Sequence, residues 1–337
     1  MMMMMKAMWE TAKEMTLQRI TMSYQLRSAA LLLPNQLDGL CVIVTGSTSG
    51  IGYHTARELA FAGAHVIMAC RRVDAAKKIA ERWQADLDDS KTLHVEVMEL
   101  DLMSLSSVRQ FAAEWDQSGK PLHILINNAG ILLLGEPRQF SEDGIEKHIQ
   151  VNHVATSLLT LLLLPSMLKA NSARIVNVNS LGHHWGVVEP KSWKMGADEE
   201  PKFSSMMSYG SSKLAQLMFL KALSIKLVSM AKTSVLCVAV HPGIVESNLL
   251  PDGRMRGFWM LDPSEGARNV LFCSVGADVP CNTTDNFAYY SRCKPGMMSS
   301  LADDPKECWR VWDETLRILG LSPNDYLSEV IASGSSS

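Results

Sequence analysis

Six short runs rich in valine and isoleucine recur after residue 38, and longer segments of helical character separate them. The runs cover residues 41–45, 64–70, 93–100, 122–127, 174–179 and 234–241. Nearly continuous apolar character is typical of parallel strands that are buried on both faces. The segments between them, among them 51–62, 73–87, 105–115 and 209–228, are each long enough for a crossover helix. This alternation predicts an α/β fold with a doubly wound parallel sheet.

Composition narrows the class of protein. With 47% apolar and 20% charged residues in 337, a disordered or fibrous chain is excluded. The formal net charge of −3 gives no electrostatic case for a nucleic-acid partner. Seven cysteines without a CxxC pair favour buried free thiols and a reducing, cytoplasmic location. No uninterrupted apolar stretch reaches the roughly 18 residues of a transmembrane helix, and the apolar run at 154–168 is expected to be a buried helix.

The N-terminal segment allows two interpretations. Five methionines begin the chain, and Lys6, Trp9, Glu10 and Glu14 follow within the next few residues. The segment is either a loosely attached tail or an interfacial amphipathic helix that makes a peripheral membrane contact. The two acidic residues weaken attraction to an anionic surface, so neither interpretation is settled by the sequence.

A glycine-rich loop follows the first predicted strand and opens the first predicted helix. Residues 45–52 read TGSTSGIG, with the spacing G-x3-G-x-G. Glycines allow a tight turn and close backbone approach to a pyrophosphate, and a helix N-terminus presents free N–H groups to it. This placement predicts a nucleotide site, for which the candidate residues are Gly46, Ser47, Ser49, Gly50, Ile51 and Gly52.

Several ordered motifs together resemble the short-chain dehydrogenase/reductase family. After the loop come NNAG at 127–130, IVNVNS at 175–180, YGSSK at 209–213 and HPGIV at 241–245. The segment SEDGIEKHIQVNH and the long insertion at 181–208 resemble the retinol-dehydrogenase and WW-domain-oxidoreductase branch. The resemblance implies a single Rossmann domain over 38–320, with a C-terminal extension that acts as a substrate lid. Residues 1–37 would then form an N-terminal extension, and residues 321–337 a C-terminal tail.

The residues after the second predicted strand bear on cofactor choice. An NAD-specific Rossmann unit carries an acid about 20 residues past the loop, bonded to the ribose. Here Arg71 and Arg72 stand at that place, and Asp74 falls too late. A guanidinium pairs well with a 2′-phosphate, so NADP(H) is expected; NAD is the alternative if the arginines are solvated loop cations. The resemblance adds cofactor contacts at Asp101, Leu102, Asn128, Ala129, Gly130, Pro242 and Gly243, and at Ser247, where the family commonly has threonine.

Tyr209 and Lys213 are four residues apart, so they share one face of a helix. An ammonium beside the phenol is expected to lower the pKa of the tyrosine, which then exchanges a proton with an alcohol or carbonyl oxygen. Ser180 ends the fifth predicted strand, at the sheet edge where ligands bind, and can orient the substrate oxygen. The resemblance adds Asn152 as support for a proton-relay water, and cofactor contacts at Tyr209 and Lys213.

Two other groups of residues could belong to a binding site. His183, His184 and His241 have no carboxylate or cysteine at ligand spacing, so no metal is expected. Aromatic and methionine side chains either line an apolar substrate pocket or pack the lid against the sheet. They are Trp185, Trp193, Met206, Met207, Phe258, Trp259 and Met260.

The sequence therefore predicts an NADP(H)-dependent oxidoreductase that transfers a hydride between nicotinamide and a small or lipid-like alcohol or carbonyl substrate. The alternative is a cofactor-binding regulatory or scaffold protein with little turnover. Retention of all four predicted catalytic residues, Asn152, Ser180, Tyr209 and Lys213, argues against that alternative. The sequence fixes neither the substrate, nor the direction of reaction, nor the oligomeric state.

Overall fold

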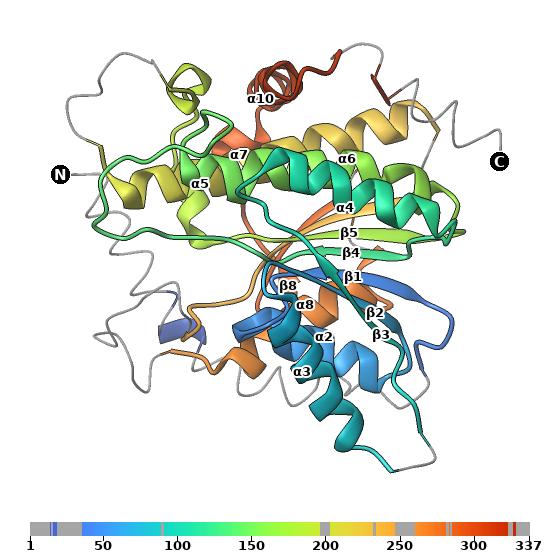
Figure 1. The fold of residues 1–337 in the computed structure, drawn as a ribbon. Helices are drawn as coiled ribbons and strands as arrows, with labels where there is room; N and C mark the ends of the chain where they lie inside the picture. The colour runs from blue at the N-terminus through green and yellow to red at the C-terminus, as the bar shows by residue number, and fades with distance from the viewer. Residues whose placement is uncertain are drawn as a thin grey trace.

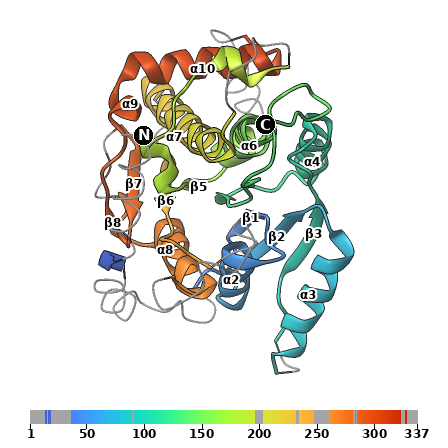
Figure 2. The same cartoon turned by 90° about the vertical axis from the view of Figure 1, so that its left-hand side faces the viewer.

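The computed structural model describes Glu14, residues 16–18, 36–88, 91–195, 203–231, 234–246, 260–280, 283, 285–322 and 326–327. Within these residues one sheet of eight strands runs in the order β3-β2-β1-β4-β5-β6-β7-β8 (Figures 1 and 2). The strands are β1 (Cys41–Thr45), β2 (His65–Cys70), β3 (Val95–Glu99), β4 (Ile124–Asn127), β5 (Ala173–Val178), β6 (Val235–His241), β7 (Phe287–Ser291) and β8 (Lys294–Pro295). Every neighbouring pair is parallel except β7 and β8.

The predicted parallel sheet is confirmed. β1 lies between β2 and β4, so the order of strands reverses beside the glycine-rich loop that follows β1. Ligands of open α/β sheets bind in the crevice at such a switch point, outside the carboxyl ends of the strands. The continuous apolar runs have a direct explanation, because Val42, Ile43 and Val44 are all fully buried on alternate faces of β1.

Helices cover both faces of the sheet, as Figure 2 shows from the side. One face is covered by α2 (Gly50–Phe61), α3 (Val73–Ala85) and α8 (Pro263–Val275). The other is covered by α4 (Leu105–Gln117), α6 (Ala155–Leu168) and α7 (Ser205–Ser229), and α10 (Pro305–Leu319) packs on α7. Shorter helical elements lie between these: α5 (Lys147–Ile149), the π-helical η1 (Gln150–Val154), the 3-10 turns η2 (Leu181–His184) and η3 (Pro190–Trp193), and α9 (Ser300–Asp303).

The apolar run that contains α6 is a core helix, as predicted. The helical stretch Lys147–Leu168, with a mean hydropathy of 1.5, has the length and composition of a membrane span. However, 83% of the most apolar part of this stretch is buried inside the fold. Leu158, Leu161 and Leu164 are each fully buried between α4, α7 and the sheet. Among the described residues, no other helix has the length and composition to span a membrane.

The described part of the C-terminal extension packs on the core helices, and its role as a substrate lid stays a prediction. The ring of Trp312 on α10 stacks on Phe219 of α7, with centroids 4.8 Å apart. Leu327 is 2% exposed in the same core, so packing continues past the predicted domain boundary at 320. α10 carries a strongly apolar stripe, and this stripe is buried against α7.

Several residues for which the sequence predicts a role lie outside the described part of the chain. Of the N-terminal extension, the structure describes Glu14 and residues 16–18 and 36–37, so the membrane contact through this segment stays a prediction. Ser247, Phe258 and Trp259 also lie outside the described ranges. The expectation of buried free thiols is confirmed for Cys41, Cys70, Cys237, Cys273 and Cys308, and Cys293 is free but half-buried.

The start of α8 provides a test of local stability. Asp262 is its N-cap: the Asp262 carboxylate accepts the Ser264 N–H at 2.8 Å, and the Glu265 carboxylate accepts the Asp262 N–H at 2.8 Å. Asp262→Ala should lower the free energy of unfolding by about 1 kcal/mol, the usual scale for a lost N-cap. Chemical denaturation measures this, with Asp88→Ala, an exposed position, as a control with no such effect.

The same contact predicts a pH dependence. Hydrogen bonds from Ser264 hold the pKa of Asp262 below its ordinary value of 3.8. Because the folded-state pKa is lowered, the stabilisation is present above that ordinary value and is lost as pH falls through the lower folded value. The difference between wild type and Asp262→Ala should therefore shrink in acid. An equal difference at pH 7 and pH 3 would contradict the role of the carboxylate.

Candidate active site

One cavity of about 1020 Å³ lies at the carboxyl ends of the central strands. It brings together most of the residues that the sequence predicted. Those that line it are Gly46, Ser49, Gly50, Ile51, Arg71, Arg72, Asp101, Leu102, Asn128, Ala129, Gly130, Ser180, Tyr209, Lys213, Pro242 and Gly243. Segments far apart in the sequence therefore meet at the switch point of the sheet, as a single binding site requires.

Two residues predicted as cofactor contacts lie behind the glycine-rich loop rather than on the cavity wall. Ser47 is fully buried, and Gly52 sits in the first turn of α2. A Cβ on Gly52 would lie 2.4 Å from the Asn128 side-chain nitrogen and 2.5 Å from the Gly46 carbonyl oxygen. Gly52 is thus needed for close packing behind the loop, and that packing shapes the surface offered to a ligand.

Hydrogen bonds tie the loop after β1 to the loop after β4. The Thr45 hydroxyl accepts the backbone N–H groups of Asn128 and Ala129, each at 3.0 Å. The Asn128 side-chain amide donates to the Thr45 carbonyl at 2.9 Å and to the Gly46 carbonyl at 3.3 Å. These bonds satisfy backbone groups at the ends of two strands and hold both loops open around the cavity.

The rim beyond β2 and β3 fits the adenosine half of a dinucleotide. Arg71 and Arg72 are exposed at the end of β2 and line the cavity. Asp101 lies after β3, where its carboxylate accepts the Met103 N–H at 2.9 Å. The glycine-rich turn leaves room for a pyrophosphate at the N-terminus of α2, whose N–H groups and dipole favour an anion. The residues present therefore match the donor set that a nicotinamide dinucleotide needs.

The tyrosine and lysine of the predicted catalytic pair sit inside α7, not at its start. α7 begins at Ser205, and Tyr209 is its fifth residue. Tyr209 is 9% exposed and Lys213 3% exposed. The Lys213 ammonium donates to the Val178 carbonyl at 2.9 Å, and burial lowers the pKa of Lys213 to about 8. Lys213 is therefore still mostly protonated at neutral pH.

The expected lowering of the Tyr209 pKa is wrong for this structure. Burial raises the pKa of Tyr209 above its ordinary value, and a hydrogen bond with Ser180 opposes that rise without overcoming it. The physical reason is that burial disfavours the phenolate, while the Lys213 ammonium is bonded to the Val178 carbonyl instead. The phenol therefore holds its proton at neutral pH.

Asn152 is connected to the cavity through its hydrogen-bond partners. It lies in the π-helical turn η1, a local irregularity that is frequent at functional sites. Its side-chain nitrogen donates to the Ile131 carbonyl at 3.0 Å and to the Ser212 hydroxyl at 2.9 Å, and its oxygen accepts the Ile131 N–H at 2.8 Å. Asn152 is fully buried and does not line the cavity. In this structure it joins the loop after β4 to the turn of α7 that carries Tyr209.

The sequence missed several cavity-lining residues. Leu132 and Leu133 follow the NNAG motif, and Leu181 follows Ser180. The apolar run at 131–134 after NNAG was the available signal, but such a run does not distinguish a pocket wall from a core. Of the aromatic and methionine residues proposed for the pocket, Trp185 and Met206 line the cavity. Trp193 packs in the core, and neither Met207 nor Met260 is among the lining residues.

Two histidines beside the cavity, His183 and His241, are expected to be neutral. Burial lowers the pKa of both His183 and His241 to about 3. A ring nitrogen of His183 lies 2.6 Å from the Ser180 carbonyl oxygen, which holds the turn after Ser180. Among the residues that the structure describes, no group of three or more histidine, cysteine, aspartate or glutamate side chains is arranged to hold a metal ion.

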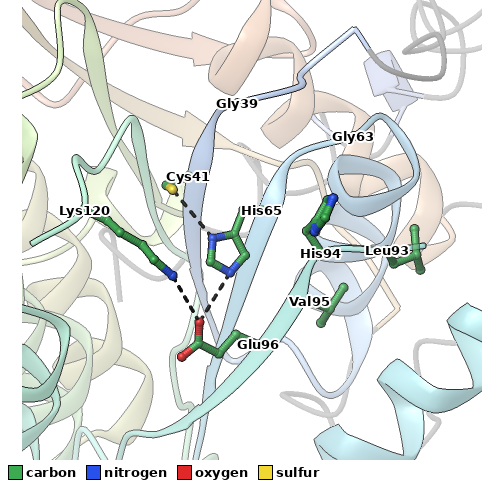
Figure 3. Close-up of a pocket in the computed structure, with 9 residues that line it drawn as sticks. All are labelled: Gly39, Cys41, Gly63, His65, Leu93, His94, Val95, Glu96 and Lys120. Atoms are coloured by element: carbon green, nitrogen blue, oxygen red, sulfur yellow. Dashed lines mark hydrogen bonds and ion pairs between the residues drawn. The ribbon is translucent and has the colours of Figure 1, made fainter. Parts of the chain in front are cut away.

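A second pocket, of about 720 Å³, lies at the opposite end of the sheet (Figure 3). There the Cys41 sulfur lies 3.7 Å from His65 Nδ1, and His65 Nε2 lies 3.3 Å from a Glu96 oxygen, which Lys120 approaches to 3.8 Å. Burial raises the pKa of the Cys41 thiol and lowers that of His65. The thiol is thus kept protonated, and the pocket lies at the amino ends of the strands, away from the crevice where such sheets bind ligands.

Comparisons with known proteins agree with the geometry. A family model described as short chain dehydrogenase matches residues 40–191. The chain is 41% identical over 335 residues to Dehydrogenase/reductase SDR family member FEY of Arabidopsis thaliana, covering 94% of this chain and 87% of the relative. It is 36% identical to Retinol dehydrogenase 12 of Mus musculus, covering 85% of this chain and 88% of that protein. A solved structure of an uncharacterized protein from Mycobacterium Paratuberculosis, 30% identical, covers 87% of this chain and 97% of its own, with a TM-score of 0.69.

The packing behind the glycine-rich loop predicts the effect of one added methyl group. In Gly52→Ala the new Cβ meets the Gly46 backbone oxygen, so the loop must change shape. We expect nucleotide affinity, measured by calorimetry, to fall at least about tenfold, since about 1.4 kcal/mol of lost fit corresponds to tenfold. Gly119→Ala is the control: its φ of +64° strains the backbone, but open space surrounds the position and the cavity is distant. Equal nucleotide affinity of Gly52→Ala and wild type would refute the role of this packing.

Proposed function

The chain is an oxidoreductase of the short-chain dehydrogenase/reductase family, and we propose that it transfers a hydride between NADP(H) and a lipid-like alcohol or carbonyl substrate. One observation carries the proposal: Tyr209, Ser180 and Lys213 meet the glycine-rich loop in one cavity at the switch point of the sheet. A phenol, a hydroxyl and an ammonium beside a dinucleotide site provide the groups that redox chemistry at a carbonyl requires.

Tyr209 is the proton donor and acceptor in this proposal. Because burial keeps the phenol protonated, Tyr209 can give its proton to a carbonyl oxygen as the carbonyl is reduced. Ser180, hydrogen-bonded to Tyr209, can orient the same oxygen and stabilise the charge that develops on it. When bound, the nicotinamide supplies or accepts the hydride at the substrate carbon.

Lys213 and Asn152 support the tyrosine in different ways. The cationic Lys213 favours the phenolate that forms when the proton has been given up, and it can hold the cofactor ribose. Asn152 holds Ser212, whose hydroxyl donates to the Tyr209 carbonyl at 2.7 Å. It thereby fixes the turn of α7 on which Tyr209 lies. Support of a relay water by Asn152, as the family resemblance implies, stays a prediction.

The preference for NADP(H) rests on Arg71 and Arg72. Both line the cavity at the end of β2, where an NAD-specific site would place a carboxylate. Charged hydrogen bonds to a 2′-phosphate would add affinity that NAD(H) cannot gain.

The lipid-like character of the substrate rests on the wall near Tyr209. Leu132, Leu133 and Leu181 line the cavity there, together with Trp185 and Met206. Met206 is 37% exposed, and Leu134, next to the lining residues, is 47% exposed. An apolar wall that reaches the surface suits a substrate with a long apolar body. The related Retinol dehydrogenase 12 is named for a substrate of that kind.

Removal of the Tyr209 hydroxyl tests the catalytic assignment. Tyr209→Phe should lower turnover of long-chain apolar aldehydes with NADPH by at least about a hundredfold, because the proton donor is lost. NADPH affinity should change little, since the ring still fills its place. Tyr326→Phe, a half-buried tyrosine near the C-terminus, serves as the control and should keep full activity. Near-normal turnover of Tyr209→Phe would show that another group moves the proton.

Charge reversal at the rim tests the cofactor preference. Arg71→Asp should weaken NADPH about tenfold to a hundredfold more than NADH, because a phosphate partner becomes a repelling carboxylate. If Arg72 makes the contact, Arg72→Asp should show the effect instead. Arg82→Asp, exposed in the last turn of α3, makes the same charge change outside the cavity-lining set and should leave the ratio near wild type. Equal affinities of the wild type for both cofactors would end the NADP(H) proposal.

A further inference from the structure

The loop after β6 forms one wall of the cavity, through Pro242, Gly243, Ile244 and Val245. Gly243 has a φ of +96°, a left-handed conformation that favours glycine. On one side, the side chain of Asn269 on α8 donates to the Pro242 carbonyl at 3.0 Å. The shape of this wall therefore depends on contacts from outside the loop.

Gln18, from the N-terminal extension, provides a second such contact, 226 residues away in the sequence. The Ile244 N–H donates to Gln18 Oε1 at 2.8 Å, and Gln18 Nε2 donates to the Ile244 carbonyl at 3.3 Å. One side-chain amide thus pairs with both polar groups of one residue, as a neighbouring strand would. Gln18 is fully buried, and a Cβ on Gly243 would lie only 3.1 Å from Gln18 Oε1.

Glu14 fixes the same helical segment at a second place. It lies four residues before Gln18, so both side chains point from one face of the helical turn. The Glu14 carboxylate lies 3.3 Å from Arg292 Nε, in the connection between β7 and β8. Both Glu14 and Gln18 are buried polar side chains. Burial of such groups is costly unless they are paired, so these contacts specify one docked arrangement.

We propose that Gln18 is a positioning residue of the cofactor site, which holds Gly243 and Ile244 in the shape that accepts the nicotinamide end of the dinucleotide. The inference rests on the proposed nicotinamide binding. In this inference the N-terminal extension shapes the cofactor site. A loosely attached tail or a membrane anchor would have no such role. A wall that is already in its binding shape loses less conformational freedom when a ligand binds, which increases affinity.

The test measures NADPH binding to the full-length protein. Gln18→Met keeps the length of the side chain and removes both hydrogen bonds. We expect the Kd for NADPH to rise about tenfold, the scale of one lost hydrogen bond to a buried group. In turnover assays the loss should fall on KM for the cofactor more than on kcat. Hydrogen exchange of the Ile244 amide, which Gln18 protects in the wild type, should become faster.

A conservative variant adds a second readout. In Gln18→Glu the ionised carboxylate still accepts the Ile244 N–H but faces the Ile244 carbonyl without a donor. Protonation of that carboxyl restores the donor. Burial raises the pKa of such a carboxyl, so the ratio of variant to wild-type Kd should fall as pH is lowered. A residue that merely stabilises the fold would give no such pH dependence.

Gln117→Met, at the exposed end of α4, is the matched control and should bind NADPH as the wild type does. The inference is overturned if Gln18→Met binds NADPH with wild-type Kd, or if its melting temperature falls while its Kd, measured on folded protein, does not change. The proposed function itself would fail if the wild-type protein bound neither NADPH nor NADH. The two failures are therefore distinguishable.

Discussion

The hydrogen bonds between Thr45 and the NNAG loop are the interaction on which the rest of the site depends. They join the ends of β1 and β4, the two strands between which the strand order reverses. A parallel sheet brings the carboxyl ends of its strands to one edge, and the backbone groups of the loops there need hydrogen-bond partners. The Thr45 hydroxyl and the Asn128 amide satisfy those groups, so that the cavity stays open for a dinucleotide.

A second set of bonds connects this crevice to the helix that carries the catalytic groups. Asn152, in the π-helical turn, bonds to Ile131 on one side and to Ser212 of α7 on the other. Lys213 bonds to the end of β5 through the Val178 carbonyl. Tyr209 is therefore fixed relative to both the cofactor loops and Ser180. Burial of this group explains why the phenol keeps its proton and why the lysine pKa falls to about 8.

The sequence predicted the sheet well because most of the predicted strands are buried on both faces, which makes them continuous apolar runs; β3, with Glu96 and Glu99 exposed, is the exception. The described strands that were predicted agree with those runs within two residues at each end. The sequence also identified the motifs that line the cavity, since the chemistry of ligand binding restricts their residue types. Prediction failed where tertiary packing decides. Burial reverses the expected shift of the Tyr209 pKa. The sequence also gives no sign that Gly52 packs behind the loop or that α10 packs on α7. Nothing in the local sequence around Gln18 indicates its contact with Ile244, because its partner lies 226 residues away.

A crystal structure of the chain with NADPH would test the central claim most directly. The account predicts the pyrophosphate at the 46–52 loop, the 2′-phosphate against Arg71 or Arg72, and the nicotinamide between Ile244 and the Tyr209 hydroxyl. A dinucleotide bound outside this crevice, for example in the pocket at the amino ends of β1 to β3, would contradict it. So would a nicotinamide ring out of reach of Tyr209 and Ser180.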